Sequence, residues 1–237
     1  MTRHNPISET PENEIYNENS YSNKIILVDK PLGLTSADVV YRLKRKLKLK
    51  KVGHAGTLDP RATGLLIVCT DKMTKSVNEF MELEKEYEGT IRIGARTESF
   101  DTETSEFDIK DVSHITHEEI LKARDYFLGE IEQTPPMYSA LKHKGKPLYK
   151  LARKGKTIER KPRKVLIKEF EIKRINDLHV WFKIVCSKGT YIRTIANDFG
   201  ERLGVGGYLK TLKRTRIGDY DLENLNLDID GLRYRVL

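Results

Sequence analysis

The sequence predicts an α+β fold with a mixed, mostly antiparallel central sheet flanked by helices. Apolar and polar residues alternate along 87–95, as in a strand with one buried face. Two similar segments within 165–187 are joined by a short polar turn, which indicates an antiparallel hairpin. By contrast, 39–47 and 192–203 carry apolar residues at helical spacing. Strand and helix signals therefore both occur along the chain.

The other elements follow from short apolar runs and from residues that begin or end helices. We expect strands at 25–28, 65–70 and 208–218, and helices at 35–47, 74–83 and 116–128. A hydroxyl side chain caps the first helix, a capping box begins the third at Thr116, and Gly129 ends it. In the second helix, Val77, Phe80 and Met81 are expected to face the core.

The charge of the chain favours a polyanionic partner. The formal net charge is +8 and the pI is about 9.3, although residues 1–23 are acidic, so the remainder is more basic than the total suggests. Seven Lys and Arg residues lie between 42 and 51, and eleven lie between 142 and 164. Such clusters neutralise phosphates in RNA-binding proteins, and a solvated surface is the alternative interpretation.

The chain divides into a tail, one large domain and a short end segment. Residues 1–22 are rich in Asn, Glu, Ser and Thr and almost lack apolar side chains, so we expect a disordered tail. Residues 23–220 form the main domain, including a basic arm at about 142–164 that we expect to be mobile and to order on RNA. Residues 221–237 are too few for an independent core, so no separate C-terminal RNA-binding domain is expected.

No metal site and no membrane segment are expected. Cys69 and Cys186 each end an apolar run without a further ligand nearby, and we interpret them as buried structural thiols. His114 and His117 lack additional ligands. The chain has no apolar stretch of about eighteen residues and no charged-then-apolar leader, which favours a cytoplasmic protein. Because no exposed apolar stripe stands out, we expect a monomer.

The stretch 53–66 is the strongest candidate for a functional site. It holds three glycines, a histidine and Asp59 followed by Pro60, and it leads into an apolar run. Glycines let a backbone turn sharply or lie against a ligand, and the proline biases Asp59 toward an extended or turn conformation. Such a loop presents its carboxylate at a defined place, although the same residues are also ordinary turn chemistry.

The string G-H-x-G-x-L-D-P-x-A-x-G-x-L at 53–66 resembles the catalytic signature of the TruB family of tRNA pseudouridine synthases. Further blocks resemble the same family: K-P-x-G-x-T-S at 30–36, the K-x-Y block at 85–94, P-P-x-Y-S-A-L-K at 135–142, C-S-K-G-T-Y-I-R-T at 186–194 and the basic block at 208–218. The resemblance covers roughly residues 24–220 and implies the pseudouridine synthase fold.

The resemblance also assigns roles to six residues. Arg193 is implied to pair with Asp59, the essential catalytic residue. Independently, Arg193 lies in the first turn of a helix, where the macrodipole disfavours a cation, so it needs an anionic partner or a solvent-exposed position. The other implied contacts are those of Tyr87 packed on the target base with a part in proton removal, His54 in the gap left by the extruded base, and Tyr191 and Leu212 in the uridine pocket.

The implied reaction is the isomerisation of uridine to pseudouridine at position 55, in the T-loop of tRNA. The N1–C1′ bond breaks, the uracil rotates and C5 joins C1′, without redox change or external group, so no cofactor is expected. A stacked base has to be extruded first. Asp59 can act as a nucleophile on the sugar or as a base that starts elimination, and the sequence leaves both open. Arg193 is expected to keep Asp59 ionised.

Two other classes of function stay open on the sequence alone. An RNA-binding protein that keeps this fold without turnover predicts tRNA binding that survives Asp59→Ala. A hydrolase or transferase with an Asp nucleophile and a small anionic substrate predicts indifference to tRNA, and it leaves the basic arm unexplained. The intact signature around Asp59 favours the isomerase.

Overall fold

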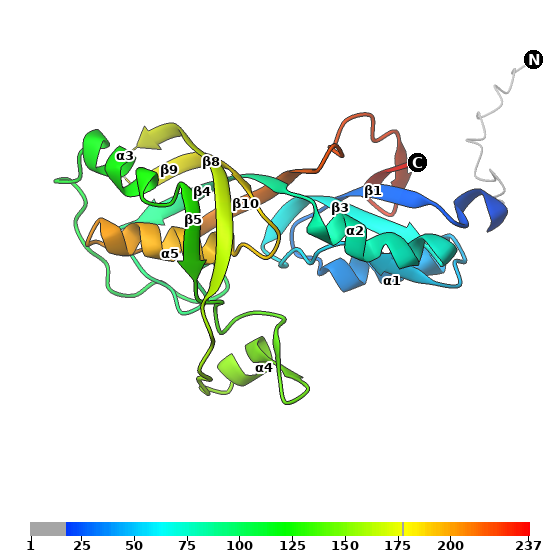
Figure 1. The fold of residues 1–237 in the computed structure, drawn as a ribbon, viewed down its shortest axis with the longest axis horizontal. Helices are drawn as coiled ribbons and strands as arrows, with labels where there is room; N and C mark the ends of the chain where they lie inside the picture. Colours follow the sequence, from blue (N-terminus) through cyan, green and yellow to red (C-terminus); the bar gives the residue numbers. More distant parts are fainter. Residues whose placement is uncertain (1–17, 177) are drawn as a thin grey trace, which may run out of the picture.

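One large sheet runs through the protein, with helices packed against it (Figure 1). The computed structural model describes residues 18–176 and 178–237. The strands of the large sheet are β1 (Ile25–Lys30), β2 (Val52–His54), β3 (Ala62–Thr70), β4 (Lys85–Ile93), β5 (Gly129–Gln133), β8 (Arg163–Asn176), β9 (His179–Cys186), β10 (Gly207–Ile217), β11 (Leu227–Ile229) and β12 (Leu232–Val236). Two short strands, β6 (Lys142–His143) and β7 (Lys146–Pro147), pair separately.

The strand order is β11-β12-β1-β3-β10-β4-β9-β8-β5, and β2 pairs with β3. The pairing of β3 with β10 is parallel, whereas the pairs of β10 with β4, of β4 with β9 and of β8 with β9 are antiparallel. The predicted mixed, mostly antiparallel sheet flanked by helices is therefore confirmed. This order places β10 between β3 and β4, at the centre of the molecule.

Two of the helices, α1 and α3, begin at the residues that the capping pattern predicts. The helices are η1 (Glu18–Tyr21), α1 (Ser36–Lys46), η2 (Asp71–Ser76), α2 (Val77–Glu82), α3 (His117–Asp125), α4 (Leu148–Ala152) and α5 (Ile192–Arg202). Thr35 and Thr116 both form capping boxes, at the starts of α1 and α3. In the described residues, no helix combines the length and apolar character that crossing a membrane requires.

The continuous apolar run of β3 is explained by burial on both faces. Leu66 and Val68 pack with α1 residues such as Val39 on one face. Leu65 and Ile67 pack on the opposite face, where Phe80 of α2 joins them. A larger cluster fills the other half of the sheet, where α5 packs against β10 and β4 and α3 packs against β8. These clusters hold β3, β4 and β10 rigidly in place.

Two of the predicted helices differ from the observed ones. The helix expected at 74–83 is a 3₁₀ turn followed by the short α2, and the side chain of Met81 is 43% exposed instead of facing the core. The helix expected to run to residue 128 ends at Asp125, and Gly129 begins strand β5. This strand was not predicted, because its sequence GEIEQ has one apolar side chain and pairs only at the edge of the sheet.

The observed structure also changes both ends of the predicted domain. Residues 1–17 of the expected tail lie outside the described residues, but Tyr21 is partly buried and packs on Tyr234, so the fold begins before residue 23. The segment 221–237 is not an appendage to the domain. Its strands β11 and β12 extend the sheet beside β1, and Leu232 is fully buried. The main sheet therefore continues past residue 220, and the expected division of the chain into domains stays a prediction.

The basic arm projects from the body of the protein and is connected to the ends of β5 and β8 (Figure 1). It contains the β6–β7 hairpin and α4, in which Leu148 is 3% exposed. Arg153 forms an ion pair of 2.6 Å with Glu103 of the main body. The arm thus has regular elements in the free protein, and its mobility remains a prediction.

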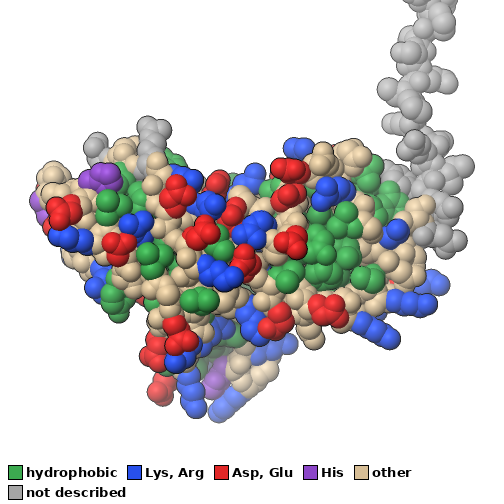
Figure 2. Space-filling model, turned by 45° about the horizontal axis from the view of Figure 1, so that its top comes forward, with side chains coloured by type: hydrophobic (Ala, Val, Ile, Leu, Met, Phe, Trp, Pro, Cys, Tyr) green, Lys and Arg blue, Asp and Glu red, His purple; other side chains and the backbone are tan. Residues whose placement is uncertain are grey.

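The positive charge of the chain is unevenly distributed. Figure 2 shows a face on which Lys and Arg side chains are interspersed with Asp and Glu, so this face carries no continuous cationic patch. Ion pairs such as Arg216 with Glu84 at 3.1 Å are of this mixed kind. The arm and the cationic face of α1 are the segments where basic residues cluster.

Candidate active site

Two sequence motifs meet at the loop that carries Asp59. The loop connects β2 with β3, and Asp59 lies three residues before β3 begins. The hydroxyl of Ser36, which is 1% exposed, accepts a hydrogen bond of 2.8 Å from the Leu58 amide and donates to the Leu58 carbonyl at 3.2 Å. The amide of Gly33 donates to the carbonyl of Pro60 at 2.8 Å. The motif at 30–36 therefore braces the loop on both sides of Asp59.

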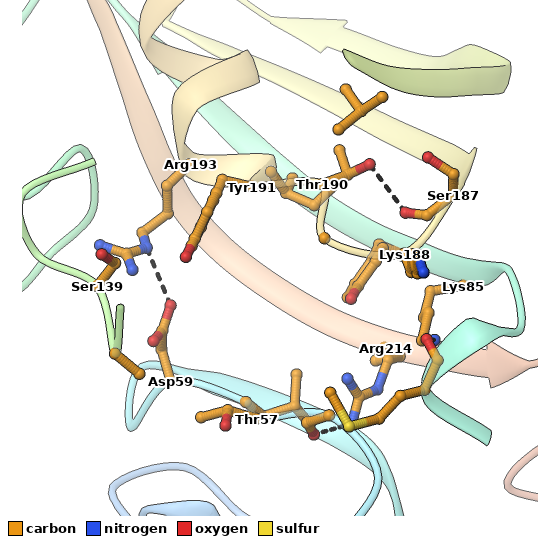
Figure 3. Close-up of a pocket in the computed structure, with 18 of the residues that line it drawn as sticks. Thr57, Asp59, Lys85, Ser139, Ser187, Lys188, Thr190, Tyr191, Arg193 and Arg214 are labelled. Atoms are coloured by element: carbon orange, nitrogen blue, oxygen red, sulfur yellow. Dashed lines mark hydrogen bonds and ion pairs between the residues drawn. The ribbon is translucent and has the colours of Figure 1, made fainter. Parts of the chain in front are cut away.

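Arg193 occupies the first turn of α5 and reaches this loop, as Figure 3 shows. Its Nε lies 2.9 Å from Oδ2 of Asp59, so the predicted ion pair is confirmed. Nη1 donates to the carbonyl of Ser99 at 3.0 Å, and Nη2 donates to the carbonyl of Tyr138 at 2.7 Å. The side chain of Arg193 is only 5% exposed. Through these contacts it connects α5 with the 97–113 loop and the 135–142 block around Asp59.

Asp101 is a second carboxylate at Arg193, and the sequence did not predict it. Its Oδ2 lies 3.5 Å from Nε of Arg193, and its side chain is 6% exposed. The hydroxyl of Ser99 and the amide of Glu103 donate to Oδ1 at 2.6 and 2.9 Å. Asp101 lies in a polar loop without periodicity, and a carboxylate bonded to the amide two residues on is common in such loops. The sequence therefore carried no signal for its approach to Arg193.

The environment of Asp59 pulls its pKa in two directions. Burial among protein atoms raises the pKa of Asp59, the Arg193 guanidinium lowers it, and the negative charge of Asp101 raises it again. The net direction is upward, in contrast to the expectation that Arg193 alone keeps Asp59 ionised. The single guanidinium of Arg193 thus forms ion pairs with both Asp59 and Asp101. The side chain of Asp59 is 41% exposed, and that exposure is toward a cavity.

The cavity has a volume of about 620 Å³ and brings together five of the six predicted site residues. They are Asp59, Tyr87, Tyr191, Arg193 and Leu212. These residues come from the β2–β3 loop, β4, the start of α5 and β10, and they face a common space, part of which Figure 3 shows. A cavity of this size is typical of small-molecule sites and is large enough for a nucleotide.

The aromatic side chains of the cavity are held in place by buried neighbours. Tyr87 is 9% exposed, and burial raises the pKa of its phenol. The side-chain amide of Gln133 accepts a hydrogen bond from the Tyr191 amide at 2.7 Å and donates to the Tyr191 carbonyl at 3.0 Å. The guanidinium of Arg163 lies 4.8 Å from the centre of the Tyr191 ring and donates to the carbonyl of Gly189. One face of Tyr191 is thus fixed by a cation–π contact.

His54 is not among the residues that line the cavity. It lies in β2, opposite Val68 of β3. Burial lowers its pKa, as does the positive charge of Arg214. Its Nδ1 is buried and has no hydrogen-bond partner among the described residues. The implied role of His54 in RNA binding remains a prediction.

Two buried cations, Lys85 and Arg214, line the cavity, and a third, Lys30, interacts electrostatically with Asp59 and Arg214; the sequence assigned these three cations no role. Lys30, Lys85 and Arg214 are 0%, 6% and 1% exposed. Lys30 and Lys85 open two of the motif blocks, and Arg214 lies two residues after Leu212 on the same strand. That spacing puts Leu212 and Arg214 on one face of a strand, which is the signal that could have identified Arg214.

Neither cysteine belongs to the site. Cys69 and Cys186 are buried and free, and burial raises the pKa of their thiols to about 11 and about 12. Thiols with such values are unreactive at neutral pH. Within residues 18–176 and 178–237, no group of three or more His, Cys, Asp and Glu side chains is placed to hold a metal ion.

Comparisons with known proteins agree with this geometry. A family model described as TruB family pseudouridylate synthase (N-terminal domain) matches residues 44–192. A protein named tRNA pseudouridine synthase B from Chloroherpeton thalassium is 52% identical over 204 residues, which cover 84% of this chain and 85% of that protein. A protein of the same name from Flavobacterium johnsoniae is 48% identical, covering 85% of this chain and 91% of its own.

Solved structures show the same fold in longer chains. A crystal structure of a Cbf5-Nop10-Gar1 complex matches with a TM-score of 0.69 and 28% identity, over 88% of this chain and 53% of that chain. The structure of an H/ACA RNP bound to a substrate RNA containing 2′-deoxyuridine matches with a TM-score of 0.66 and 27% identity, over 89% of this chain and 52% of that chain. The chain spans about half the length of these two.

Proposed function

The chain belongs to the TruB family of pseudouridylate synthases, and from this we propose that its cavity takes in the T-loop uridine of tRNA at position 55. The protein is an isomerase that converts uridine to pseudouridine in tRNA. The observation that supports the proposed site is the contact of Arg193 with Asp59, 2.9 Å apart at the wall of a nucleotide-sized cavity.

Asp59 is the proposed catalytic residue. The reaction breaks the bond between N1 and C1′, and its electron pair leaves with the uracil. The Asp59 carboxylate either forms a bond to C1′ or removes the proton from C2′, and both routes return it unchanged when C5 joins C1′. Arg193 aims the carboxylate, since its planar fork binds Asp59 while its other nitrogens are held by two backbone carbonyls.

Tyr87, Tyr191 and Leu212 are proposed to bind the uracil. Stacking on an aromatic ring holds an extruded base without restricting its rotation about the ring normal. After the new C5–C1′ bond forms, C5 has to lose its proton, and the Tyr87 hydroxyl is the proposed participant in that transfer. His54 is proposed to stack in the space that the extruded base leaves in the T-loop.

RNA affinity is proposed to come from the domain itself. The arm at 142–164 and the cations of α1 supply the charges, and the arm borders the cavity through Arg163 and Lys164. Phosphate neutralisation by such groups makes affinity fall steeply with salt. We further propose a monomer, located in the cytoplasm, and light scattering of the purified protein tests the first of these.

The experiment that tests the function uses unmodified tRNA and purified protein without added cofactor. Carbodiimide mapping detects pseudouridine, and one modified T-loop uridine is the expected product. A T-loop left unchanged after prolonged incubation with excess enzyme would contradict position 55 as the target. Pseudouridine at another position of the tRNA would agree with isomerase activity but contradict position 55 as the target.

A further inference from the structure

Arg214 is the most deeply buried guanidinium of the cavity wall. It is 1% exposed, and it lies in β10 with β3 on one side and β4 on the other. Nε donates to the carbonyl of Leu65 at 2.7 Å, and Nη2 donates to the carbonyl of Gly56, in the loop that carries Asp59, at 3.1 Å. Two backbone carbonyls from separate segments thus fix the direction of its side chain.

The backbone packing around Arg214 is equally tight. Gly64 has a φ of +100°, and a Cβ there would lie 2.2 Å from the carbonyl oxygen of Arg214. Glycine is thus required where β3 passes β10. On the other side, Arg214 pairs with Tyr87 across the ladder of β10 and β4. The guanidinium is therefore held next to the residue proposed to contact the base.

In the described part of the chain, no carboxylate lies within 4.0 Å of the guanidinium nitrogens of Arg214. A buried charge is costly unless an opposite charge or hydrogen bonds compensate it. The two carbonyls accept hydrogen bonds from Arg214, but within the described residues no carboxylate balances its positive charge. A cation kept in this state at a cavity wall favours an anion in the cavity.

The neighbouring lysines add to this positive field. Lys85 donates to the carbonyls of Met81 and Leu83 at 2.7 and 2.6 Å, and Lys30 donates to the carbonyl of Leu34 at 2.7 Å. Burial, together with the positive charge of Arg214, lowers the pKa of each lysine to about 8. Both lysines thus lose part of their charge near pH 8, whereas an arginine stays protonated. Arg214 is the permanent charge of the group.

We propose that Arg214 is a further catalytic residue of the isomerisation, and that its guanidinium stabilises the negative charge that the uracil carries after its bond to C1′ breaks. The inference rests on the proposed function. The electron pair of the N1–C1′ bond stays on the uracil and is spread over its ring and carbonyl oxygens. That pair then forms the C5–C1′ bond, which removes the negative charge of the uracil, and C5 afterwards releases its proton while N1 gains one.

The first test compares Arg214→Gln with Arg216→Gln. Arg216 lies on the same strand but pairs with Glu84 and Glu86 at 3.1 and 3.7 Å, and it does not line the cavity. We expect Arg214→Gln to lower the single-turnover rate roughly 10²- to 10³-fold, as is usual for loss of one group that stabilises developing charge. The Kd for tRNA should stay within about threefold, and Arg216→Gln should stay within about threefold in both.

The second test separates a catalytic charge from a purely structural role. A tRNA with 5-fluorouridine at the target position carries a base whose anion is more stable, because fluorine withdraws electrons. If Arg214 stabilises that anion, the loss caused by Arg214→Gln should be at least about fivefold smaller on the fluorinated tRNA, measured as consumption of the fluorinated nucleotide. If Arg214 only holds strands together, the loss should be equal on both substrates.

The outcomes distinguish a failure of the proposed function from a failure of the role proposed for Arg214. A wild-type protein without activity on uridine contradicts the proposed function, whereas an active wild type with Arg214→Gln within threefold contradicts only the role of Arg214. An equal loss on both tRNAs also overturns that role. If Arg214→Gln does not fold, Arg214→Lys replaces it. Lys keeps one charge with fewer donors, so an intermediate loss of about tenfold is expected, again smaller on the fluorinated substrate.

Discussion

The two buried arginines of the cavity differ in what compensates their charge. Arg193 and Arg214 are 4% and 1% exposed, and each donates to two backbone carbonyls. Arg193 also faces Asp59 and Asp101 at 2.9 and 3.5 Å. Arg214 has no carboxylate at that distance within the described residues. One end of the cavity is therefore balanced or slightly negative, and the other is positive.

This difference separates the two tasks of the reaction. At the Arg193 end, the guanidinium contacts the carboxylate that is proposed to act on the sugar, and the charge of a second carboxylate raises the pKa of the first. At the Arg214 end, a guanidinium without a carboxylate partner is proposed to stabilise the base when it leaves the sugar. A polarised cavity of this kind suits a reaction that separates charge within one nucleotide.

Removal of the Asp59 charge should abolish the reaction at the Arg193 end of the cavity. We expect Asp59→Asn to lower the single-turnover rate by roughly 10⁴-fold or more, because the amide can neither attack C1′ nor accept a proton. The Kd for tRNA should stay within a few fold. The measurement is pseudouridine formation under excess enzyme, with Asn197→Ala, a partly exposed position of α5, as a control. Residual turnover above 1% of wild type would exclude Asp59 as the reacting group.

Replacement of Arg193 should have the next largest effect. Arg193→Lys keeps the charge but cannot reach two carboxylates and two carbonyls at once, so we expect a rate roughly 10²- to 10³-fold lower. Arg202→Lys, at the other end of the same helix, is the matched control. A thermal melt recorded beside the kinetics shows whether the fold is retained. An unchanged rate would mean that Asp59 is positioned by its loop alone.

Asp101→Asn should shift the pH dependence. The charge of Asp101 raises the pKa of Asp59, so its removal lowers that pKa and moves the acid limb of the rate profile to lower pH. We expect the plateau rate to fall roughly tenfold, because Arg193 loses one anchor. Asp108→Asn, in the same loop but paired with Arg96, serves as control. An acid limb that moves upward would contradict this interpretation.

Replacement of basic residues in the arm should have the smallest effect on the rate of the chemical step. Combined replacement of the exposed Lys144, Lys146 and Lys150 by Gln should weaken tRNA binding roughly tenfold and reduce the salt slope by about one per lost phosphate contact. The rate at saturating enzyme should change less than about threefold. Filter binding across a salt series measures this, with a triple Gln variant at 110, 122 and 173 as control. Equal effects of both variants would show that the arm has no special role.

Much of the fold followed from local patterns in the sequence. The strands β3, β9 and β10 were predicted from apolar runs and alternation, α1 from a hydroxyl cap and helical spacing, and α3 from a capping box. Strand β5 and the β11–β12 hairpin were missed, because short edge strands bury few apolar side chains and leave little periodicity. Register and strand order were not predicted at all.

The candidate site was predicted in part. The pairing of Arg193 with Asp59 was expected because a cation in the first turn of a helix needs an anion, and the resemblance named its partner. Asp101 carries no comparable signal. Arg214 received no role, although its spacing from Leu212 places both residues on one face of the strand; its burial, in contrast to the exposed Lys213, is seen only in the structure.

The sequence by itself determined which segments form strands and helices, and which loop presents a carboxylate, because caps, turns and alternation act between near neighbours. Only the tertiary structure decided how charge is distributed around that carboxylate. Arg214 bonds to Leu65 across 149 positions, and the contact exists because β10 pairs with β3 and β4. The burial and the partners of each charge set its energy, and both arise only when distant strands assemble.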